Sequence, residues 1–381
     1  MAEMHETPSA NRLRIAFFGP RNAGKSTLVN AFTGQDVAIV SDVPGTTTDP
    51  VSKAMEIPPL GPCLVTDTAG LDDEGELGAM RVRRTLEVLA VADVAVWVEG
   101  ADPDACSALR ERFLAECRRN GTAAIVHRRG DGVDELMRKV AAAKVTERER
   151  GLLDGIVRDG ERLVLVCPID SSAPKGRLIL PQVQLVRECL DRHLACVVCQ
   201  PEELPAELAR AGGAALVVTD SQAFAAVAAA VRAHGGASTR LTSFSILYAR
   251  QKGDLAAYAG GIAAARRLRA GDRVLVAEGC THHRQCDDIG AVKIPKAIER
   301  LSGARPEFSF ASGGTFDLGA DGGGFALAVQ CGGCMLTRRE VLRRIRLCRE
   351  AGVPVVNYGM LLAAAGGLGE VRADGTVETG K

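Results

Sequence analysis

The glycine-rich segment Gly19–Ser26 constrains the fold of this chain more than any other part of its sequence. It has the sequence Gly-Pro-Arg-Asn-Ala-Gly-Lys-Ser, a complete G-x-x-x-x-G-K-[ST] pattern. The apolar run Leu13–Phe18 precedes it, and residues 26–32 have the pattern of a helix. A strand, a phosphate-binding loop and a helix in this order are typical of P-loop domains, which are built on a parallel sheet. We therefore expect an α/β fold in which this loop binds a nucleotide.

Each residue type in this loop has a physical role in phosphate binding. Glycines let backbone N–H groups face the β-phosphate, Lys25 reaches the β and γ phosphates, and the Ser26 hydroxyl is a ligand for Mg²⁺. A chance glycine loop is the alternative, and the strand–loop–helix context argues against it. The residues that we expect to contact the nucleotide are Gly19, Asn22, Ala23, Gly24, Lys25, Ser26 and Thr27.

Two further segments have the pattern of nucleotide switches. Asp67-Thr-Ala-Gly70 follows a predicted strand at Cys63–Thr66 and matches D-x-x-G, in which the Asp contacts the Mg²⁺ shell and the Gly N–H senses the γ-phosphate. Residues 44–49 have the sequence Pro-Gly-Thr-Thr-Thr-Asp, a candidate switch in which Thr47 completes the metal shell. A threonine run alone is more often a plain loop, but this one lies between two nucleotide motifs. The predicted catalytic residues are Lys25, Thr47, Asp67 and Gly70.

The rest of the chain alternates short apolar runs with helical patterns, which predicts two smaller α/β domains after the P-loop domain. We expect a flexible tail over 1–11, the P-loop domain over 12–150, a second domain over 160–250 and a third over 251–381. The further predicted strands are 94–98, 123–126, 163–166, 195–199, 215–218, 273–277, 325–329 and 354–356.

The composition predicts a cytoplasmic globular protein. Hydrophobic residues make up 46% and charged residues 25% of the 381 residues, as in ordinary globular domains. No apolar run approaches the ~20 residues of a membrane span, and the polar N-terminus has no signal-peptide core, so we expect no membrane contact. The 47 basic and 47 acidic residues cancel, which argues against a nucleic-acid partner. In the cytoplasm the twelve cysteines would be reduced thiols or metal ligands.

Three cysteines follow predicted strands directly. Cys280 comes after the strand 273–277 and a Glu-Gly turn, and Cys331-Gly-Gly-Cys334 comes after the strand 325–329. In open α/β sheets, ligands gather outside the carboxyl ends of the strands, so we expect these thiols to converge on a metal. Buried structural cysteines are the alternative, which we expect for the nine others. Four arginines near the helix that begins at Thr337 are expected to lower the thiol pKa values: Arg338, Arg339, Arg343 and Arg344.

Two kinds of metal site fit these residues. Zinc in a Cys₃His site is one. An iron–sulfur cluster is the other; such clusters usually take four cysteines, so three would leave one iron open to another ligand. His282 is the candidate fourth ligand, and His283, Cys286 and Asp287 are also near in the sequence.

The first domain resembles the Era/TrmE branch of GTPases, whose switch has the sequence Gly-Thr-Thr. The resemblance makes Asn22 a candidate for holding K⁺ and implies slow turnover, because Leu71 stands where Ras-type proteins have a water-orienting Gln. The chain has no Asn-Lys-x-Asp, the element that recognises guanine in this branch. The predicted strand at 123–126 continues instead into His127-Arg-Arg-Gly-Asp131. We interpret this as a deletion. It would leave the domain one strand short and would remove the motif on which guanine specificity depends.

The whole chain, from about 12 to 362, resembles the HydF family of [FeFe]-hydrogenase maturation GTPases. The resemblance rests on segments 41–50, 170–182 and 242–247, and on Cys280-Thr-His-His with 287–290. It implies a homodimeric scaffold that binds a [4Fe-4S] cluster through Cys280, Cys331 and Cys334, and GTP with Mg²⁺. It also implies that the scaffold receives a diiron precursor from radical-SAM maturases and delivers it to apo-[FeFe]-hydrogenase, with the middle domain dimerising and GTP turnover gating partner exchange. The family pattern has a second histidine where this chain has Gln330.

Three other functions are alternatives for this sequence. A zinc-stabilised P-loop regulator would use the cysteines only to hold the fold, and a repurposed family member would have another client and altered nucleotide specificity. The first domain alone also suggests a tRNA-modification GTPase. The neutral charge and the absence of that family's helical domain argue against it.

Overall fold

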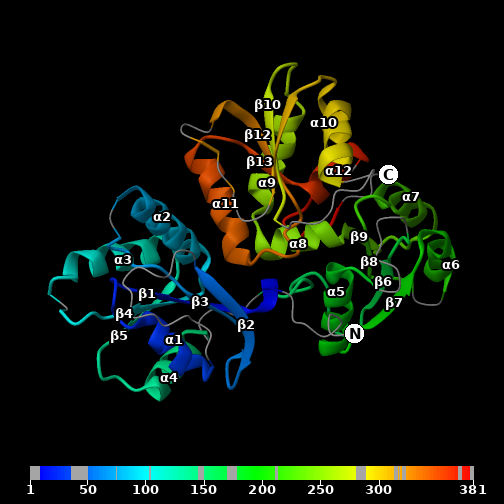
Figure 1. Ribbon diagram of the computed structural model, residues 1–381. Coiled ribbons are helices and arrows are strands. Elements are labelled where there is room, and N and C mark those ends of the chain that lie inside the picture. Colours follow the sequence, from blue (N-terminus) through cyan, green and yellow to red (C-terminus); the bar gives the residue numbers. More distant parts are fainter. Residues whose placement is uncertain are drawn as a thin grey trace. The chain divides into compact units, whose positions relative to one another are not determined.

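The computed structural model, residues 1–381, divides into two compact units, Met1–Arg148 and Glu149–Lys381 (Figure 1). The structure describes residues 9–35, 50–73, 75–102, 104–144, 150–169, 178–210, 213–279, 289–312, 316, 318–319, 323–367 and 371–377. Several predicted features lie outside these residues, namely Thr47, the segment 170–177, Cys280 and His282. Of the predicted tail, the described part is a short 3₁₀ helix, Ser9–Asn11.

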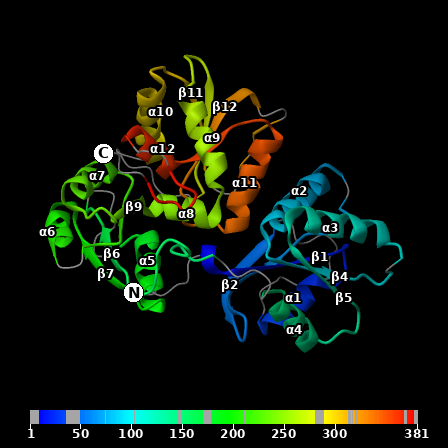
Figure 2. The ribbon, with the colours of Figure 1, turned by 180° about the vertical axis from the view of Figure 1, so that it is seen from behind.

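The first unit contains a five-stranded sheet in the order β2-β3-β1-β4-β5, antiparallel only between β2 and β3. Helices α2 and α3 lie on one side of this sheet and α1 and α4 on the other (Figures 1 and 2). The elements are β1 (Leu13–Phe18), α1 (Lys25–Thr33), β2 (Val51–Ile57), β3 (Gly61–Asp67), α2 (Gly75–Val91), β4 (Val94–Val98), α3 (Ser107–Asn120), β5 (Ala123–His127) and α4 (Val133–Lys144).

Strand β1 is central because both of its faces carry apolar side chains. Ile15 and Phe17 belong to the core under α1 and α4, whereas Ala16 and Phe18 belong to the core with Trp97. Successive side chains on a strand point to opposite faces, so a continuous apolar run of this kind fits only between two layers of helices. This packing fixes the end of β1, and therefore the start of the glycine loop, in the middle of the sheet.

The second unit contains two parallel four-stranded sheets. The middle sheet has the order β7-β6-β8-β9 and the third sheet the order β11-β10-β12-β13. The elements of the middle part are β6 (Arg162–Val166), α5 (Leu180–Asp191), β7 (Ala195–Cys199), α6 (Leu204–Ala209), β8 (Leu216–Thr219), α7 (Phe224–His234), β9 (Arg240–Ser243) and α8 (Phe244–Lys252). Those of the third part are α9 (Leu255–Ala265), β10 (Arg273–Ala277), a π-helical turn (Ile289–Lys293), α10 (Ile294–Ser302), β11 (Glu307–Ala311), β12 (Phe325–Gln330), α11 (Arg338–Glu350), β13 (Val355–Asn357) and α12 (Tyr358–Ala365).

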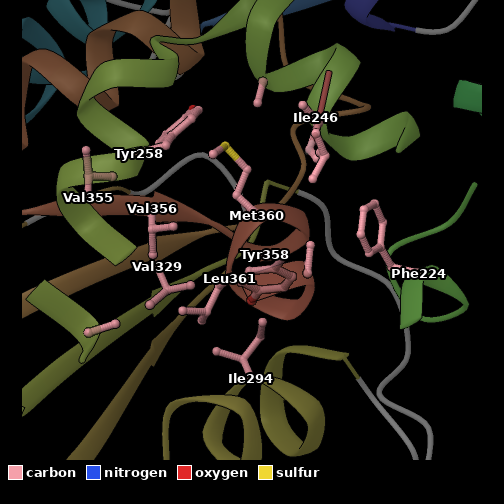
Figure 3. Close-up of a cluster of buried hydrophobic side chains, with 14 of the residues drawn as sticks. Phe224, Ile246, Tyr258, Ile294, Val329, Val355, Val356, Tyr358, Met360 and Leu361 are labelled. Atoms are coloured by element: carbon pink, nitrogen blue, oxygen red, sulfur yellow. The ribbon is translucent and has the colours of Figure 1, made fainter. Parts of the chain in front are cut away.

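The two sheets of the second unit share one apolar core. Phe224 and Ile246 from the middle part pack in the same cluster as Met360 and Leu361 of α12 (Figure 3). Close packing leaves no room for a side chain at Gly359, where a Cβ would overlap the Ser245 side chain. The C-terminal segment also returns to the middle sheet, since Thr242 Oγ1 donates to the carbonyl oxygen of Gly375 at 2.6 Å. Burial of this shared surface makes the second unit one compact body.

The α/β fold with parallel sheets is confirmed, and each strand predicted from an apolar run is present within two residues at either end. Strands β2, β9 and β11 were not predicted. All three are edge strands, and β2 is mostly exposed, so their sequences lack a continuous apolar run. Helix α8 runs across 250–251, the position of the predicted boundary between the second and third domains.

Within the described residues, none of the helices combines the length and apolar character that crossing a membrane requires.

Candidate functional site

The glycine loop has backbone conformations that suit phosphate binding. Gly24 has φ +85° and Asn22 φ +57°, both in the left-handed region, and Gly19 has φ +151°. A Cβ on Gly19 would overlap the carbonyl oxygen of Val98, the last residue of β4. Glycine is therefore required at Gly19 by close approach and at Gly24 by conformation. Ala23 N donates to Pro20 O at 3.4 Å and closes the loop.

Lys25 lies buried at the start of α1. Its ammonium group donates to the carbonyl oxygens of Pro20 at 2.7 Å and Gly19 at 3.3 Å. Burial lowers the pKa of Lys25, and the negative charges of Asp67, Asp72 and Asp73 oppose that effect. The loop thus holds a buried cation directly under the position where phosphates bind in P-loop proteins.

Asp67 and Ser26 form the oxygen pair that a Mg²⁺ ion needs. Ser26 Oγ donates to Asp67 Oδ2 at 2.6 Å, and Asp67 is 1% exposed. No described residue donates a hydrogen bond to the other carboxylate oxygen, Oδ1. Burial raises the pKa of Asp67, and the Ser26 hydrogen bond and the Lys25 charge oppose it. An unpartnered oxygen on a buried carboxylate beside a hydroxyl fits a hard cation with oxygen ligands.

The D-x-x-G segment is tied to the glycine loop. Leu71 N donates to Gly19 O at 3.3 Å, and Arg21 N donates to Asp72 Oδ1 at 2.7 Å. A Cβ on Gly70 would lie 2.5 Å from Arg21 Cγ and 2.7 Å from Asp72 Oδ1. Of the remaining predicted residues, Thr27 is exposed on α1, Asn22 is exposed in the loop, and Thr47 lies outside the described residues.

A partly buried ion pair between Glu99, which follows β4, and Arg110 of α3 lies beside the end of β5, where the guanine motif is absent from the sequence. Arg110 Nη1 donates to Glu99 Oε1 at 2.6 Å, and Glu99 N donates to His127 O at 3.0 Å. Burial lowers the pKa of His127. The negative charges of Asp131 and Glu135 oppose this lowering, and the positive charge of Lys139 adds to it. The described part of this sheet has five strands, and β5 passes through a short turn directly into α4.

Two of the predicted metal ligands lie at the carboxyl edge of the third sheet. Cys331 follows β12 and Cys334 lies in the next turn, both partly exposed. The backbone N–H of Gly279, which follows β10, donates to Cys331 Sγ at 3.1 Å. Cys280 is the next residue in the sequence after Gly279 and lies outside the described residues, as does His282. The predicted meeting of the ends of β10 and β12 is therefore present in the backbone around Cys331.

The pKa of the Cys331 thiol differs from the prediction. Burial raises the pKa of the Cys331 thiol, although hydrogen bonds from Gly333 and Gly279 and the charge of Arg344 lower it, and Cys334 adds to the rise. Arg344 lowers the pKa as predicted, but the net pKa of the metal-free thiol is raised, because the cost of burying a thiolate exceeds the attraction of the cation. Of the predicted arginines, Arg344 is the one that acts on Cys331; it is fully buried and lies 3.4 Å from Glu340.

Gln330, the residue that replaces the family's second histidine, is held in the core. It is 1% exposed, and its Nε2 donates to the hydroxyl of Tyr258 on α9 at 2.5 Å. Its amide nitrogen thus makes a hydrogen bond inside the core.

Lys252, at the end of α8, was not predicted. It is buried and donates to backbone carbonyls of the cysteine turn, including Gly333 O at 3.2 Å. The contact spans 81 residues of sequence, so no local pattern could have indicated it.

The donor chemistry at this edge fits a thiophilic metal. Among the described residues, no three His, Cys, Asp or Glu side chains lie close enough together to hold one. The predicted set requires Cys280, beyond the described part of the chain. Thiolates that accept backbone N–H hydrogen bonds, with cationic side chains nearby, are the usual setting of iron–sulfur clusters.

Three family models match the chain in consecutive segments. A model described as "50S ribosome-binding GTPase" matches residues 14–127. The "Hydrogen maturase F dimerization domain" matches 152–253, and the "Hydrogen maturase F tetramerization domain" matches 256–371.

Curated relatives match part of the chain. The tRNA modification GTPase MnmE of Rhizorhabdus wittichii is 35% identical over 151 residues, which cover 38% of this chain and 32% of that protein. The MnmE protein of Methylobacterium sp. (strain 4-46) is 34% identical over 227 residues, which cover 55% of this chain and 46% of the relative. The chain thus spans less than half the length of these relatives.

Solved structures with similarity include Era of Aquifex aeolicus, with 15% identity and a TM-score of 0.26 over 78% of this chain and 93% of that one. The G domain of the T. maritima FeoB iron transporter has 19% identity and a TM-score of 0.26 over 35% of this chain and 99% of that domain.

Proposed function

The chain belongs to the hydrogen maturase F family, and we propose that it is a GTP-hydrolysing scaffold that carries an iron–sulfur cluster during maturation of [FeFe]-hydrogenase. Two domain models of that family match 152–253 and 256–371, directly after a GTPase domain model at 14–127. The observation that carries the proposal is the Gly279–Cys331 contact, because it brings the residue before Cys280 to the sulfur of a second predicted ligand.

The nucleotide site of this proposal is built on Lys25, Ser26 and Asp67. Lys25 would exchange its bonds to Gly19 O and Pro20 O for phosphate oxygens, which keeps the buried ammonium hydrogen-bonded throughout. Ser26 and Asp67 would hold Mg²⁺, with Thr47 as a further ligand. The ion neutralises developing charge on the transferring phosphate.

The first unit differs from related GTPases at two places, and we expect slow turnover and an altered base preference as a result. Leu71 cannot orient an attacking water, and Asn22 remains the candidate K⁺ ligand that would supply positive charge. The chain has no Asn-Lys-x-Asp, and β5 ends at the Glu99–Arg110 pair. We therefore expect discrimination between GTP and ATP to be weaker than in relatives that contain the motif.

The cluster of this proposal is [4Fe-4S], bound by Cys280, Cys331 and Cys334. The three cysteines leave one iron without a protein thiolate, and Gln330 stands where the family pattern has a second histidine. His282 or an exchangeable small ligand would take that position. The scaffold would receive a diiron precursor from radical-SAM maturases and pass it to apo-[FeFe]-hydrogenase in the cytoplasm.

Dimerisation would use the β7 edge of the middle sheet. Strand β7 is at the edge, and Val198 on it is 45% exposed. Val183 and Leu190 of the neighbouring helix α5 are 48% and 64% exposed. An edge that no described strand covers, with exposed apolar side chains beside it, suits strand addition by a second copy.

Anaerobic iron and sulfide analysis with EPR, without nucleotide and with GTP or ATP, tests the proposal. We expect iron and sulfide in a ratio typical of a cubane, and an EPR signal of the reduced cluster that nucleotide alters. A colourless protein with stoichiometric zinc and no iron would instead support the zinc-stabilised regulator.

A further inference from the structure

Lys252 is a buried cation at the point where the two halves of the second unit meet. It is the last residue of α8 and is 8% exposed. Helix α8 begins at the end of β9 in the middle sheet, and it packs against α5 of the middle part and against α11 and α12 of the third part. Burying a lysine is costly unless its ammonium group is well bonded, so its partners indicate what the charge is for.

The ammonium group of Lys252 bonds the turn that carries the two cysteines. It donates to Leu336 O at 3.0 Å, Gly333 O at 3.2 Å and Cys334 O at 3.5 Å. An ammonium group has three N–H donors, and three carbonyl oxygens of one turn lie around it. Gly333 in this turn has φ +70°, a left-handed conformation that glycine adopts without strain. Because glycine can adopt many other conformations as well, external contacts are needed to keep the turn in this one.

The residues on either side of Lys252 hold the next helix in the same way. Gln251 O accepts a hydrogen bond from Arg338 Nε at 3.2 Å, at the start of α11. Arg349 Nη2 lies 3.2 Å from Asp254 Oδ2, near the end of that helix. The segment 251–254 therefore contacts both ends of α11 and the turn before it.

Tyr248, one turn earlier on α8, links this contact to the middle part. Lys252 Nζ lies 4.9 Å from the centre of the Tyr248 ring, where the ring quadrupole favours a cation. The Tyr248 hydroxyl donates to Gln184 Oε1 on α5. The cysteine turn is thus connected through α8 to the helix beside the β7 edge.

We propose that Lys252 is a positioning residue that fixes the Cys331–Cys334 turn for metal binding and supplies a local positive charge to the anionic cluster held there. Only the second part of this proposal, the positive charge supplied to the cluster, rests on the proposed function. Thiolate-ligated clusters carry net negative charge, and nearby charge and hydrogen bonds set their potentials. Lys252 would favour the reduced cluster, which has one more negative charge than the oxidised one.

Three full-length variants test the two halves separately. Lys252→Met removes charge and donors, Lys252→Arg keeps both, and Lys296→Met makes the same change at an exposed position on α10. In the metal-free proteins, the rate of iodoacetamide alkylation at Cys331 and Cys334 is measured by peptide mass spectrometry. After reconstitution with ferrous iron and sulfide, the midpoint potential is measured by EPR-monitored titration.

We expect Lys252→Met to be alkylated about tenfold faster than wild type, because the bonds that hold the turn are lost. Its cluster should be about tenfold harder to reduce, which is about 59 mV for one electron. Lys252→Arg and Lys296→Met should behave as wild type. If circular dichroism shows that Lys252→Met is unfolded, Lys252→Gln replaces it.

Equal alkylation rates in wild type and Lys252→Met would overturn the positioning role. An unchanged potential in Lys252→Met would overturn the charge role and leave a purely structural lysine. A wild-type protein that binds no iron would refute the proposed function and the charge role together, and the alkylation rates would still decide the positioning role.

Discussion

The buried amide of Gln330 donates a 2.5 Å hydrogen bond to the hydroxyl of Tyr258, 72 residues earlier in the chain. Gln330 ends β12 and directly precedes Cys331, whereas Tyr258 lies on α9. The bond holds the residue before the first cysteine of the turn against the helix layer. A glutamine at this position therefore stabilises the fold at the place where the family has a histidine.

The first prediction concerns this bond. Tyr258→Phe should lower the free energy of unfolding by about 1–3 kcal/mol, because it leaves the buried Gln330 amide without its acceptor. Urea unfolding curves measure the change. Tyr358→Phe is the matched control, since it removes a hydroxyl whose contact with Glu278 is long, at 3.4 Å. Equal losses in the two variants would contradict the importance of the Gln330–Tyr258 bond.

The second prediction concerns Asp67. Asp67→Asn should reduce Mg²⁺-dependent GTP hydrolysis by about 100-fold or more, because a neutral amide is a poor ligand for the cation. Thermal stability should be unchanged or increased, since the substitution removes a buried charge whose pKa is already raised. Asp134→Asn, an exposed change on α4, serves as the control. Hydrolysis within twofold of wild type in Asp67→Asn would contradict the assignment.

The third prediction uses two glycines of the first unit. Gly70→Ala should abolish hydrolysis but leave nucleotide binding measurable, because the new Cβ meets Arg21 and Asp72 and restricts the switch segment. Gly132→Ala, where a Cβ has nothing within 4 Å, should hydrolyse GTP like wild type. Phosphate release and fluorescent-nucleotide titration measure the two activities. A fully active Gly70→Ala would show that this segment need not move.

The fourth prediction separates the two sites. Cys331→Ser should abolish stable cluster binding and leave GTP hydrolysis intact, because the thiolate lies on the third sheet and the glycine loop in the other unit. Cys106→Ser, at a partly exposed cysteine of the first unit, should retain iron. Iron content after anaerobic reconstitution is the measurement. Unchanged iron in Cys331→Ser would refute the ligand assignment.

The fifth prediction is a pH dependence. Burial lowers the pKa of His127 below its ordinary value of 6.5 in the folded protein, so the unfolded chain binds more protons in mildly acidic solution. The stability that neutral His127 contributes is complete above pH 6.5 and is lost as the pH falls from 6.5 to the lowered folded value, by at most about 1.4 kcal/mol per pH unit. Unfolding of wild type and His127→Gln between pH 7.5 and 5 should show a steeper acid loss for wild type. Parallel curves would contradict the effect.

The strand-forming runs of the first sheet were predictable because their physics is local. Val94–Val98 is a continuous apolar run, and Leu13–Phe18 is interrupted only by Arg14; runs of this length fit a strand that is buried on both faces. Strand β2 has the sequence Val-Ser-Lys-Ala-Met-Glu-Ile, whose first four residues are all exposed, and it has no such apolar run. Its position is set by pairing with β3 rather than by its own residues.

The sequence by itself determined the glycine loop, the D-x-x-G segment, the α/β class and the placement of Cys331 and Cys334 after a strand. Each of these depends on residues within a few positions of one another, where spacing alone fixes the chemistry.

The tertiary structure decided which distant groups surround those motifs. The bonds of Lys252 to the cysteine turn and of Gln330 to Tyr258 join residues more than 70 positions apart. The raised pKa of Cys331 comes from burial, whose effect on the pKa is larger than the opposite effect of the nearby Arg344 charge. Desolvation and long-range hydrogen bonds depend on packing, and packing exists only after the chain has folded.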